Sequence, residues 1–432
     1  MPTPRPSLHT GVILMLALRN LRRNVRRTLL TAAALVIGGM YLTLALLVVD
    51  GMIEQWINDG VRTGTGHVTI ERPGFRLSQE IDDRLPASAR PAVMRALAAP
   101  DIAEQVTSVF PRLTINGLAS SAAGAQPAQI LGVDPETEAA LGSITEQVVD
   151  GRYLEAGDRL EAYIGSGLAE RLDLRIGARL VLSAQDTEKE IAGQLVRVVG
   201  IFGTGVAELD ESLVHIPLAT AGTWLGAGED VTNIGVVVDD STDVPRLVRG
   251  LRQALADSIA RGEAAVIGWQ DAMPMLRDAV FIERWGGYLI QAILFVIIGF
   301  GVVNTVLMSV LHRHREFGVL HALGLTPRQT AAVVLVEGMA LTAVSGIIGV
   351  GLGVWICWFF MADGFDLTQI SSAYDGLTFS GVAIDPVLYP VFRLSRLVQA
   401  LGFMVFIGAV ASLYPAFRAA TIDAAEAMKF DR

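Results

Sequence analysis

The chain has 432 residues, of which 52% are hydrophobic and only 18% charged, and its mean hydropathy is +0.47. This composition is too apolar for an ordinary soluble protein and indicates a membrane protein. The formal net charge is −10, and residues 50–284 hold 35 acidic and 20 basic side chains, a net charge of −15. Such an acidic segment argues against nucleic acid and against an anionic bilayer surface as its partners.

The chain begins with a basic segment, residues 1–27. Residues 1–30 contain six arginines and no acidic residue, and "LALRNLRRNVRRTLL" spaces its leucines along a helical stripe. This pattern predicts an amphipathic helix lying on the inner membrane surface. Two roles remain open for it, an anchor to anionic headgroups and a contact for a cytoplasmic partner.

Four apolar segments are long enough to cross a hydrocarbon core of about 30 Å, which takes roughly 20 residues. They are residues 28–49, 285–311, 331–362 and 397–417. The first has an uncharged run of 22 residues, longer than the apolar region of a signal peptide, so we expect a retained helix. Because residues 1–30 and 312–330 are rich in arginine, the positive-inside rule places both termini, including the tail 418–432, in the cytoplasm. Residues 50–284 and the loop 363–396 then lie outside.

The large outer domain, residues 50–284, alternates strand and helix patterns. "GHVTIERPG", "VTSVFPRLTING", "AQPAQILGVD", "NIGVVVDD" and "EAAVIGW" read as strands, with helical patterns around "RPAVMRALAAP" and "DVPRLVRGLRQALADSIA". This order predicts a ferredoxin-like split β-α-β-β-α-β part, interrupted at about 135–228 by an inserted β-rich subdomain. The first two spans continue into the domain without an obvious loop, which predicts a pair of stalk helices in which Pro274 either lies near the start of the second or kinks it.

Motifs for chemistry are missing from the sequence. The chain has two lysines, Lys189 and Lys429, and no phosphate-binding G-x-x-x-x-G-K-[ST] loop, H-E-x-x-H, C-x-x-C or G-x-S-x-G motif. His312, His314 and His321 lack the spacing and the carboxylate neighbours of a metal site. The single Cys357 is read as a packing residue. We therefore expect no catalytic residue, no metal and no cofactor in this chain.

Residues 312–330 connect the second and third spans. "REFGVLHALGLTP" predicts a short helix in which Phe317, Leu320 and Leu323 point one way, Gly324 caps the end, and Pro327 starts the next helix. Such a helix is either a connector lying on the membrane interface or a knob that inserts into a cytoplasmic partner.

The third span contains one charge and several glycines. Glu337 lies nearly two helical turns into the span, and we expect it to be hydrogen-bonded near the cytoplasmic interface. Gly346, Gly349 and Gly353 are predicted to allow close helix packing, and the last two have GxxxG spacing.

These segments together resemble a known family. "NTVLMSVLHRHREFGVLHALGLTPRQTAAVVLVEG" resembles the hallmark segment of FtsX-like permeases, with matches at Arg315, Glu316, Gly318, Leu320, Ala322, Gly324 and Glu337. "YPAFRAATIDAAEAMK" resembles the family's ending, with Ala424 where proline is usual and Met428 in place of leucine. "GRYLEAGD", "YIGSGLAERLDLRIGARLVL" and "VVGIFGTGVAELDESLVHIPLATA" are similar to outer domains of MacB-type and LolC/LolE-type permeases.

The resemblance implies an FtsX-like permease domain over about 285–425 and a dimer, either a homodimer or a LolC/LolE-like heterodimer. It implies a separate cytoplasmic ABC ATPase subunit dimer that binds ATP and Mg, and a coupling helix seated on it. The residues carried over to that helix are Arg315, Glu316, Phe317, Gly318, Leu320, His321, Ala322, Leu323 and Gly324.

The expected activity is mechanotransmission across a bacterial inner membrane, in which ATPase strokes move the periplasmic domain. A lipoprotein or another lipidic cargo is the leading substrate, with a periplasmic carrier or an outer-membrane channel as a further partner. Two alternatives stay open, MacB-like export of peptides, toxins or drugs and an FtsX-like relay that controls a cell-wall hydrolase.

Overall fold

The structure of the protein is a computed structural model, which describes residues 25–142, 144–322, 324–369, 378–379, 382–383 and 387–422. The chain divides into two compact units. The helical unit comprises Met1–Met52, Ile282–Phe365 and Val387–Arg432, and the sheet unit comprises Ile53–Phe281 and Asp366–Pro386. Most of the basic segment predicted over 1–27, and the tail from residue 423 onward, lie outside the described residues.

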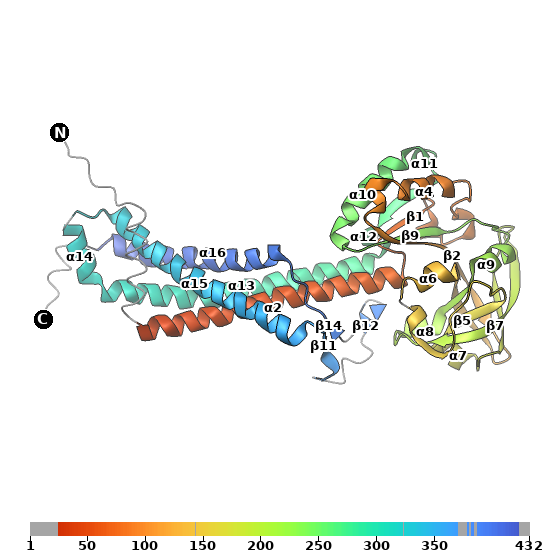
Figure 1. Ribbon diagram of the computed structural model, residues 1–432, viewed down its shortest axis with the longest axis horizontal. Helices are drawn as coiled ribbons and strands as arrows, with labels where there is room; N and C mark the ends of the chain where they lie inside the picture. The colour runs from red at the N-terminus through yellow and green to blue at the C-terminus, as the bar shows by residue number, and fades with distance from the viewer. Residues whose placement is uncertain are drawn as a thin grey trace. The chain divides into compact units, whose positions relative to one another are not determined.

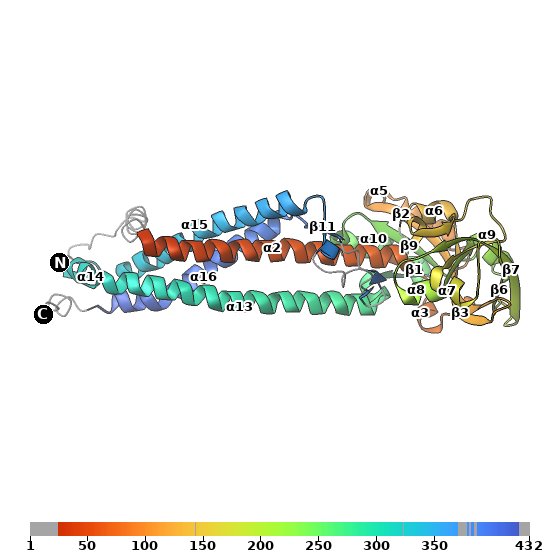
Figure 2. The same cartoon turned by 90° about the horizontal axis from the view of Figure 1, so that it is seen from below.

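Four helices within the described residues are long and apolar enough to cross a membrane. They are α2 (Val25–Thr63), α13 (Pro274–His312), α15 (Pro327–Met361) and α16 (Leu394–Ala420), which run alongside one another in the helical unit (Figures 1 and 2). α2 and α13 continue unbroken past the predicted span ends into the sheet unit, and Pro274 is the first residue of α13. A capping box between Thr326 and Gln329, with Pro327 at the first helical position, starts α15.

Three glycines of α15, Gly346, Gly349 and Gly353, lie where this helix closely approaches its neighbours. A Cβ built on Gly349 would be 2.6 Å from the carbonyl oxygen of Val36 in α2, and one on Gly353 would be 2.7 Å from Cβ of Thr43. A Cβ on Gly346 would be 3.1 Å from Cβ of Met404 in α16. Gly349 therefore brings α15 backbone against backbone on α2, while Gly346 packs against a side chain of α16.

The sheet unit contains a ferredoxin-like part. Its strands β1 (Val68–Glu71), β2 (Val106–Ser120), β9 (Asn233–Val238) and β10 (Ala265–Gly268) pair antiparallel in the order β10-β1-β9-β2. Helix α4 (Arg90–Leu97) follows β1, and α10 (Val244–Ala254) follows β9. This is the split β-α-β arrangement predicted from the sequence, and with the four long helices it confirms the predicted fold class.

The remaining strands form a β-rich part. They are β3 (Ala125–Val133), β4 (Val148–Gly151), β5 (Glu161–Gly165), β6 (Arg179–Gln185), β7 (Ile191–Phe202) and β8 (Leu213–Pro217). The first half of β2 pairs with β9, and its second half pairs with β3 and β6. β3, which the sequence reading assigned to the split part, pairs in parallel with β8. The pairing therefore changes within β2 at Arg112, well before the predicted boundary at 135.

Short helices complete the two units. They are α3 (Phe75–Ser78), α5 (Pro100–Ala103), α6 (Pro135–Ala139), α7 (Ser166–Arg171), α8 (Ala207–Ser212), α9 (Leu218–Trp224), α11 (Ala256–Ala260), α12 (Trp269–Ala272) and α14 (His314–Ala322). The segment after α15 contains the two-residue strands β11 (Phe365–Asp366), β12 (Thr378–Phe379), β13 (Val382–Ala383) and β14 (Val387–Leu388). The main core of the β-rich part is formed by buried aliphatic side chains such as Leu113, Ile130, Ile164, Leu182 and Val198.

Candidate functional site

Helix α14 lies between α13 and α15 at one end of the helical unit (Figure 1). Its end has the hydrogen bonds of a Schellman motif: the N–H of Gly324 donates to His321 O, and the N–H of Leu325 donates to Leu320 O, each at 3.0 Å. Gly324 has φ +99°, a left-handed conformation that glycine adopts without strain. The helix thus ends where the sequence predicted, while Leu323 lies outside the described residues.

Arg313, which was not among the predicted site residues, links the start of α14 to α15. Arg313 donates from Nη1 to Glu337 Oε2 at 3.1 Å and from Nε to Glu316 Oε2 at 3.1 Å. Ser309 Oγ donates to the other Glu337 oxygen at 3.2 Å, and the Arg313 guanidinium lies 4.9 Å from the centre of the Phe317 ring. The buried carboxylate of Glu337 in α15 is thereby paired with a cation at the end of α13.

The apolar side of α14 packs against the chain's own helices. Phe317 is 1% exposed and belongs to a cluster with Val310, Val334, Ala416 and Ala419, which come from α13, α15 and α16. Gly318 is buried, and the partly buried Leu320 packs on the same cluster. Phe317 and Leu320 therefore point one way, as predicted, but toward the bundle rather than outward to a partner.

His321 links the C-terminal end of α14 to Thr330 in α15 and to Ile422 after α16. Its Nδ1 lies 3.0 Å from the carbonyl oxygen of Ile422, just after α16, and its Nε2 lies 2.9 Å from Oγ1 of the buried Thr330 in α15. Because a carbonyl oxygen only accepts, Nδ1 carries the hydrogen of that bond. Only the fold reveals these two partners of His321, which are distant from it or on another helix.

The face of α14 that points away from the bundle has a different composition. Arg315, Val319 and Ala322 are exposed, Val319 to 49%, and their spacing of four and three residues places them on one side of the helix. Val319 was not among the predicted residues. α14 is therefore fixed to three long helices on one side and presents a small mixed surface on the other.

The opposite end of α16 is fastened to α2. Arg396 donates from Nε to Asp50 Oδ2 at 2.5 Å and from Nη2 to Asp50 Oδ1 at 2.7 Å. A Cβ on Gly51 would lie 1.9 Å from the carbonyl oxygen of Tyr389, so this position of α2 admits only glycine at such a close approach. One helix thus has a polar link to α14 at its end and to α2 at its start.

Comparison with known proteins supplies a family context for this arrangement. Residues 28–254 match the family model described as the MacB-like periplasmic core domain, and residues 288–424 match the FtsX-like permease C-terminal model. The lipoprotein-releasing system transmembrane protein LolC of Neisseria meningitidis is 24% identical over 340 residues, which cover 76% of this chain and 79% of LolC.

Two further similarities concern MacB. The macrolide export ATP-binding/permease protein MacB of Brucella melitensis is 25% identical over 404 residues, which cover 90% of this chain and 59% of MacB. Among solved structures, the periplasmic region of MacB from Actinobacillus actinomycetemcomitans aligns with a TM-score of 0.35 and 15% identity, covering 48% of this chain and 90% of that one.

Proposed function

This chain belongs to the ABC transporter permeases that combine a MacB-like periplasmic core domain with an FtsX-like permease C-terminal domain, and we propose that it works by mechanotransmission. It is a permease of the inner membrane with a periplasmic domain. In the proposal, a separate cytoplasmic ATPase dimer binds ATP and Mg, and its strokes move the periplasmic domain. The name of the LolC relative, a transmembrane protein of a releasing system, is in keeping with such a division of labour.

The observation that carries the proposal is the attachment of α14. Arg313 joins it to Glu337, Phe317 inserts into the cluster between three helices, and His321 contacts Thr330 and Ile422. A helix held at both ends and along its apolar side transmits a push to the helices that hold it, because close-packed interiors deform little. The exposed side chains of Arg315, Val319 and Ala322 are the proposed seat for the ATPase.

The proposed orientation in the membrane rests on the distribution of charge. The arginines of residues 1–30 and of the α13–α15 connection support, by the positive-inside rule, the proposal that both termini and α14 lie in the cytoplasm. The domain formed by residues 50–284, which has a net negative charge, then faces the periplasm. A second permease subunit, identical or related, completes the complex, and α2 and α13 act as the stalk helices that reach the periplasmic domain.

A lipoprotein or another lipidic molecule is the proposed cargo. Support comes from the LolC relative, whose match spans three quarters of this chain. Export in the manner of MacB is the alternative that the second relative supports, since its match spans most of this chain. A signal relay to a cell-wall hydrolase is a third outcome of the experiment below.

The test is crosslinking in native membranes, purification of the full chain and identification of its partners by mass spectrometry. Two variants of the exposed face form a matched pair, Val319→Thr, which keeps size and neutrality, and Val319→Asp, which adds a charge. We expect an ABC ATPase with the wild type and with Val319→Thr, and its loss with Val319→Asp.

Retention of the ATPase by Val319→Asp would contradict the proposed seat on α14, and the lack of any ATPase with the wild type would overturn the transport mechanism. Any partner that copurifies in addition to the ATPase distinguishes the alternatives for the cargo. A lipoprotein or its carrier supports release, an outer-membrane channel supports export, and a cell-wall hydrolase supports the relay.

A further inference from the structure

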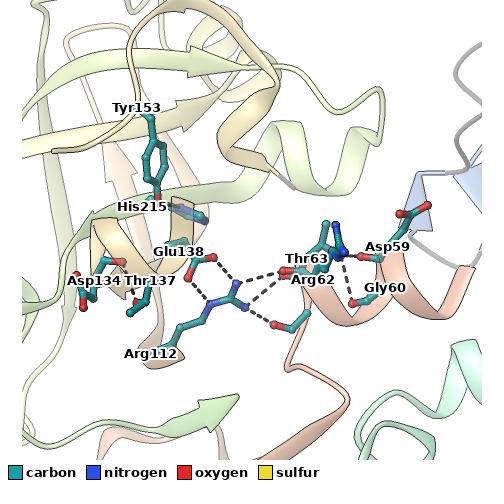
Figure 3. A network of polar contacts seen from close by, with 11 residues as sticks. Asp59, Gly60, Arg62, Thr63, Arg112, Asp134, Thr137, Glu138, Tyr153 and His215 are labelled. Atoms are coloured by element: carbon teal, nitrogen blue, oxygen red, sulfur yellow. Dashed lines mark hydrogen bonds and ion pairs between the residues drawn. The ribbon is translucent and has the colours of Figure 1, made fainter. Parts of the chain in front are cut away.

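An arginine of the sheet unit, Arg112, contacts the end of α2. The last carbonyl groups of a helix have no partner within the helix and carry partial negative charge. Arg112 of β2 donates from Nη2 to Arg62 O and from Nη1 to Thr63 O, each at 3.4 Å, and also from Nη1 to Gly64 O. Figure 3 shows the guanidinium facing these carbonyl oxygens at the end of the helix.

The other side of the same guanidinium is paired with Glu138 of α6. Nε donates to Glu138 Oε2 at 3.1 Å, and Nη2 donates to Oε1 (Figure 3). The guanidinium also lies 4.5 Å from the centre of the Phe110 ring. An arginine has five N–H groups in one plane, and here two bonds go to the carboxylate and three to the end of α2.

Arg112 occupies a special position in the sheet. It is the last residue of β2 that pairs with β9, opposite Asn233, and the first that pairs with β3, opposite Val133. Glu138 follows β3 in the chain. The ion pair therefore joins three structures at one point, namely the end of α2, the ferredoxin-like part and the β-rich part.

The burial of this pair suggests a role in orientation rather than in stability. Both side chains are 4% exposed. Taking two charges out of water costs so much that a well-packed apolar pair of similar size often gives equal or greater stability. What an apolar pair does not provide is directional bonds to the three carbonyl groups.

We propose that Arg112 and Glu138 are positioning residues that hold the end of α2 in one orientation relative to the β-rich part, so that both turn together. The consequence for transport rests on the proposed function, in which α2 carries motion from the helical unit. Without the ion pair, residues 63–66 become a joint about which the β-rich part turns independently of α2.

The experiment measures the distance between two spin labels in the full-length protein reconstituted in nanodiscs. One label replaces the exposed Arg62 side chain at the end of α2, and the other replaces the exposed Glu188 in the turn between β6 and β7. Cys357 is changed to alanine in all proteins so that the labels are the only reactive sites. The wild-type background is expected to give one narrow distribution of distances.

The decisive variant is Arg112→Met with Glu138→Leu. It keeps volume and removes both charges, so the thermal midpoint should stay close to that of the wild type while the single narrow distance peak is lost. Arg112→Lys is the second variant, because it leaves a charge for Glu138 but not the planar set of donors, and the same loss is expected. A narrow peak in either folded variant overturns the proposal.

The matched control removes another ion pair of the sheet unit. Arg84 donates to Asp230 at 2.7 Å, and the pair's other hydrogen bonds go to Ile81 O and to the N–H of Ala87. Arg84→Met with Asp230→Leu should keep the narrow peak, and a loss there would show that any lost ion pair has this effect and would refute the specific role. The measurement needs no ATPase or cargo, so its result stands independently of the partner experiment above.

Discussion

The contact between α15 and α2 makes the sharpest stability prediction. A methyl group on Gly349 would lie 2.6 Å from Val36 O, 3.0 Å from Met40 N and 3.1 Å from Gly39 Cα. All three are backbone atoms of α2, so the helix itself has to move to make room. On the same helix, a methyl group on Gly351 meets no atom within 4 Å.

We therefore expect opposite effects from Gly349→Ala and Gly351→Ala. Both substitutions gain the same helix propensity, about 1 kcal/mol, so the difference between them isolates the packing cost. Overpacking a close contact costs about 1 to 3 kcal/mol. Gly349→Ala should therefore be less stable than Gly351→Ala by about 1 to 3 kcal/mol. The stability of Gly351→Ala should equal or exceed that of the wild type.

The chain provides its own probe for this measurement. Cys357 is its single cysteine, lies in α15 and is fully buried, so a thiol-reactive dye reports the unfolding of this helix. Heating the full-length protein in detergent with the dye gives a midpoint for each variant. Equal midpoints for the two alanine variants would refute the close approach of α15 and α2.

Three further predictions follow from polar contacts. Arg396→Met removes the bidentate partner of the Asp50 carboxylate and should destabilise the protein by about 1 to 3 kcal/mol, seen as a lower thermal midpoint with the Cys357 dye. Adding Asp50→Asn in a double variant should restore part of this lost stability. Arg313→Met removes the guanidinium from the buried Glu337 carboxylate and should lower the same midpoint more than Arg313→Met with Glu337→Gln does, as a double-mutant cycle measures. Burial lowers the pKa of His215 from 6.5 to about 4, so the unfolded state binds more protons between these values. Stability of the sheet unit should therefore fall as the pH drops through that window, by about 3 kcal/mol from this group, and urea titrations of His215→Leu should show a smaller loss.

The spans and the class of the fold could be predicted because their signals are local. Each of the four long helices has an uninterrupted apolar run, and hydropathy alone locates it. The split part of the sheet unit was likewise visible in the order of strand and helix patterns. These features depend on residues that are neighbours in the sequence.

The boundary of the β-rich part could not be found in the same way. β2 is a single strand of 15 residues whose two halves pair with different partners, β9 and β3. The pattern of apolar residues in β2 does not reveal this change of partner, because such a pattern reports which side faces a core and not which strand lies alongside. The same limit hid the Arg112–Glu138 pair, whose partners come from β2, α6 and the distant end of α2.

For α14, the sequence predicts the local structure of the helix but not which surface its apolar side contacts. The sequence predicted its extent, its glycine end and the common direction of Phe317 and Leu320. An apolar stripe, however, looks the same whether it faces the chain's own bundle or another subunit. The helix is short, and among its described residues the stripe that packs on α13, α15 and α16 leaves a narrow face around Val319 exposed.

This assignment of faces changes how docking on α14 can be tested. A charge at position 320 would enter the cluster around Phe317, so the loss of a partner could arise from a displaced helix as well as from a spoiled surface. Position 319 is half exposed, and a substitution there leaves the contacts of Arg313, Phe317 and His321 in place. If the exposed face is the seat of an ATPase, Val319→Asp should abolish binding while the Cys357 dye midpoint stays that of the wild type. A loss of binding accompanied by a lower midpoint would instead mean that the fastening of the helix, and not its outer face, determines whether a partner binds.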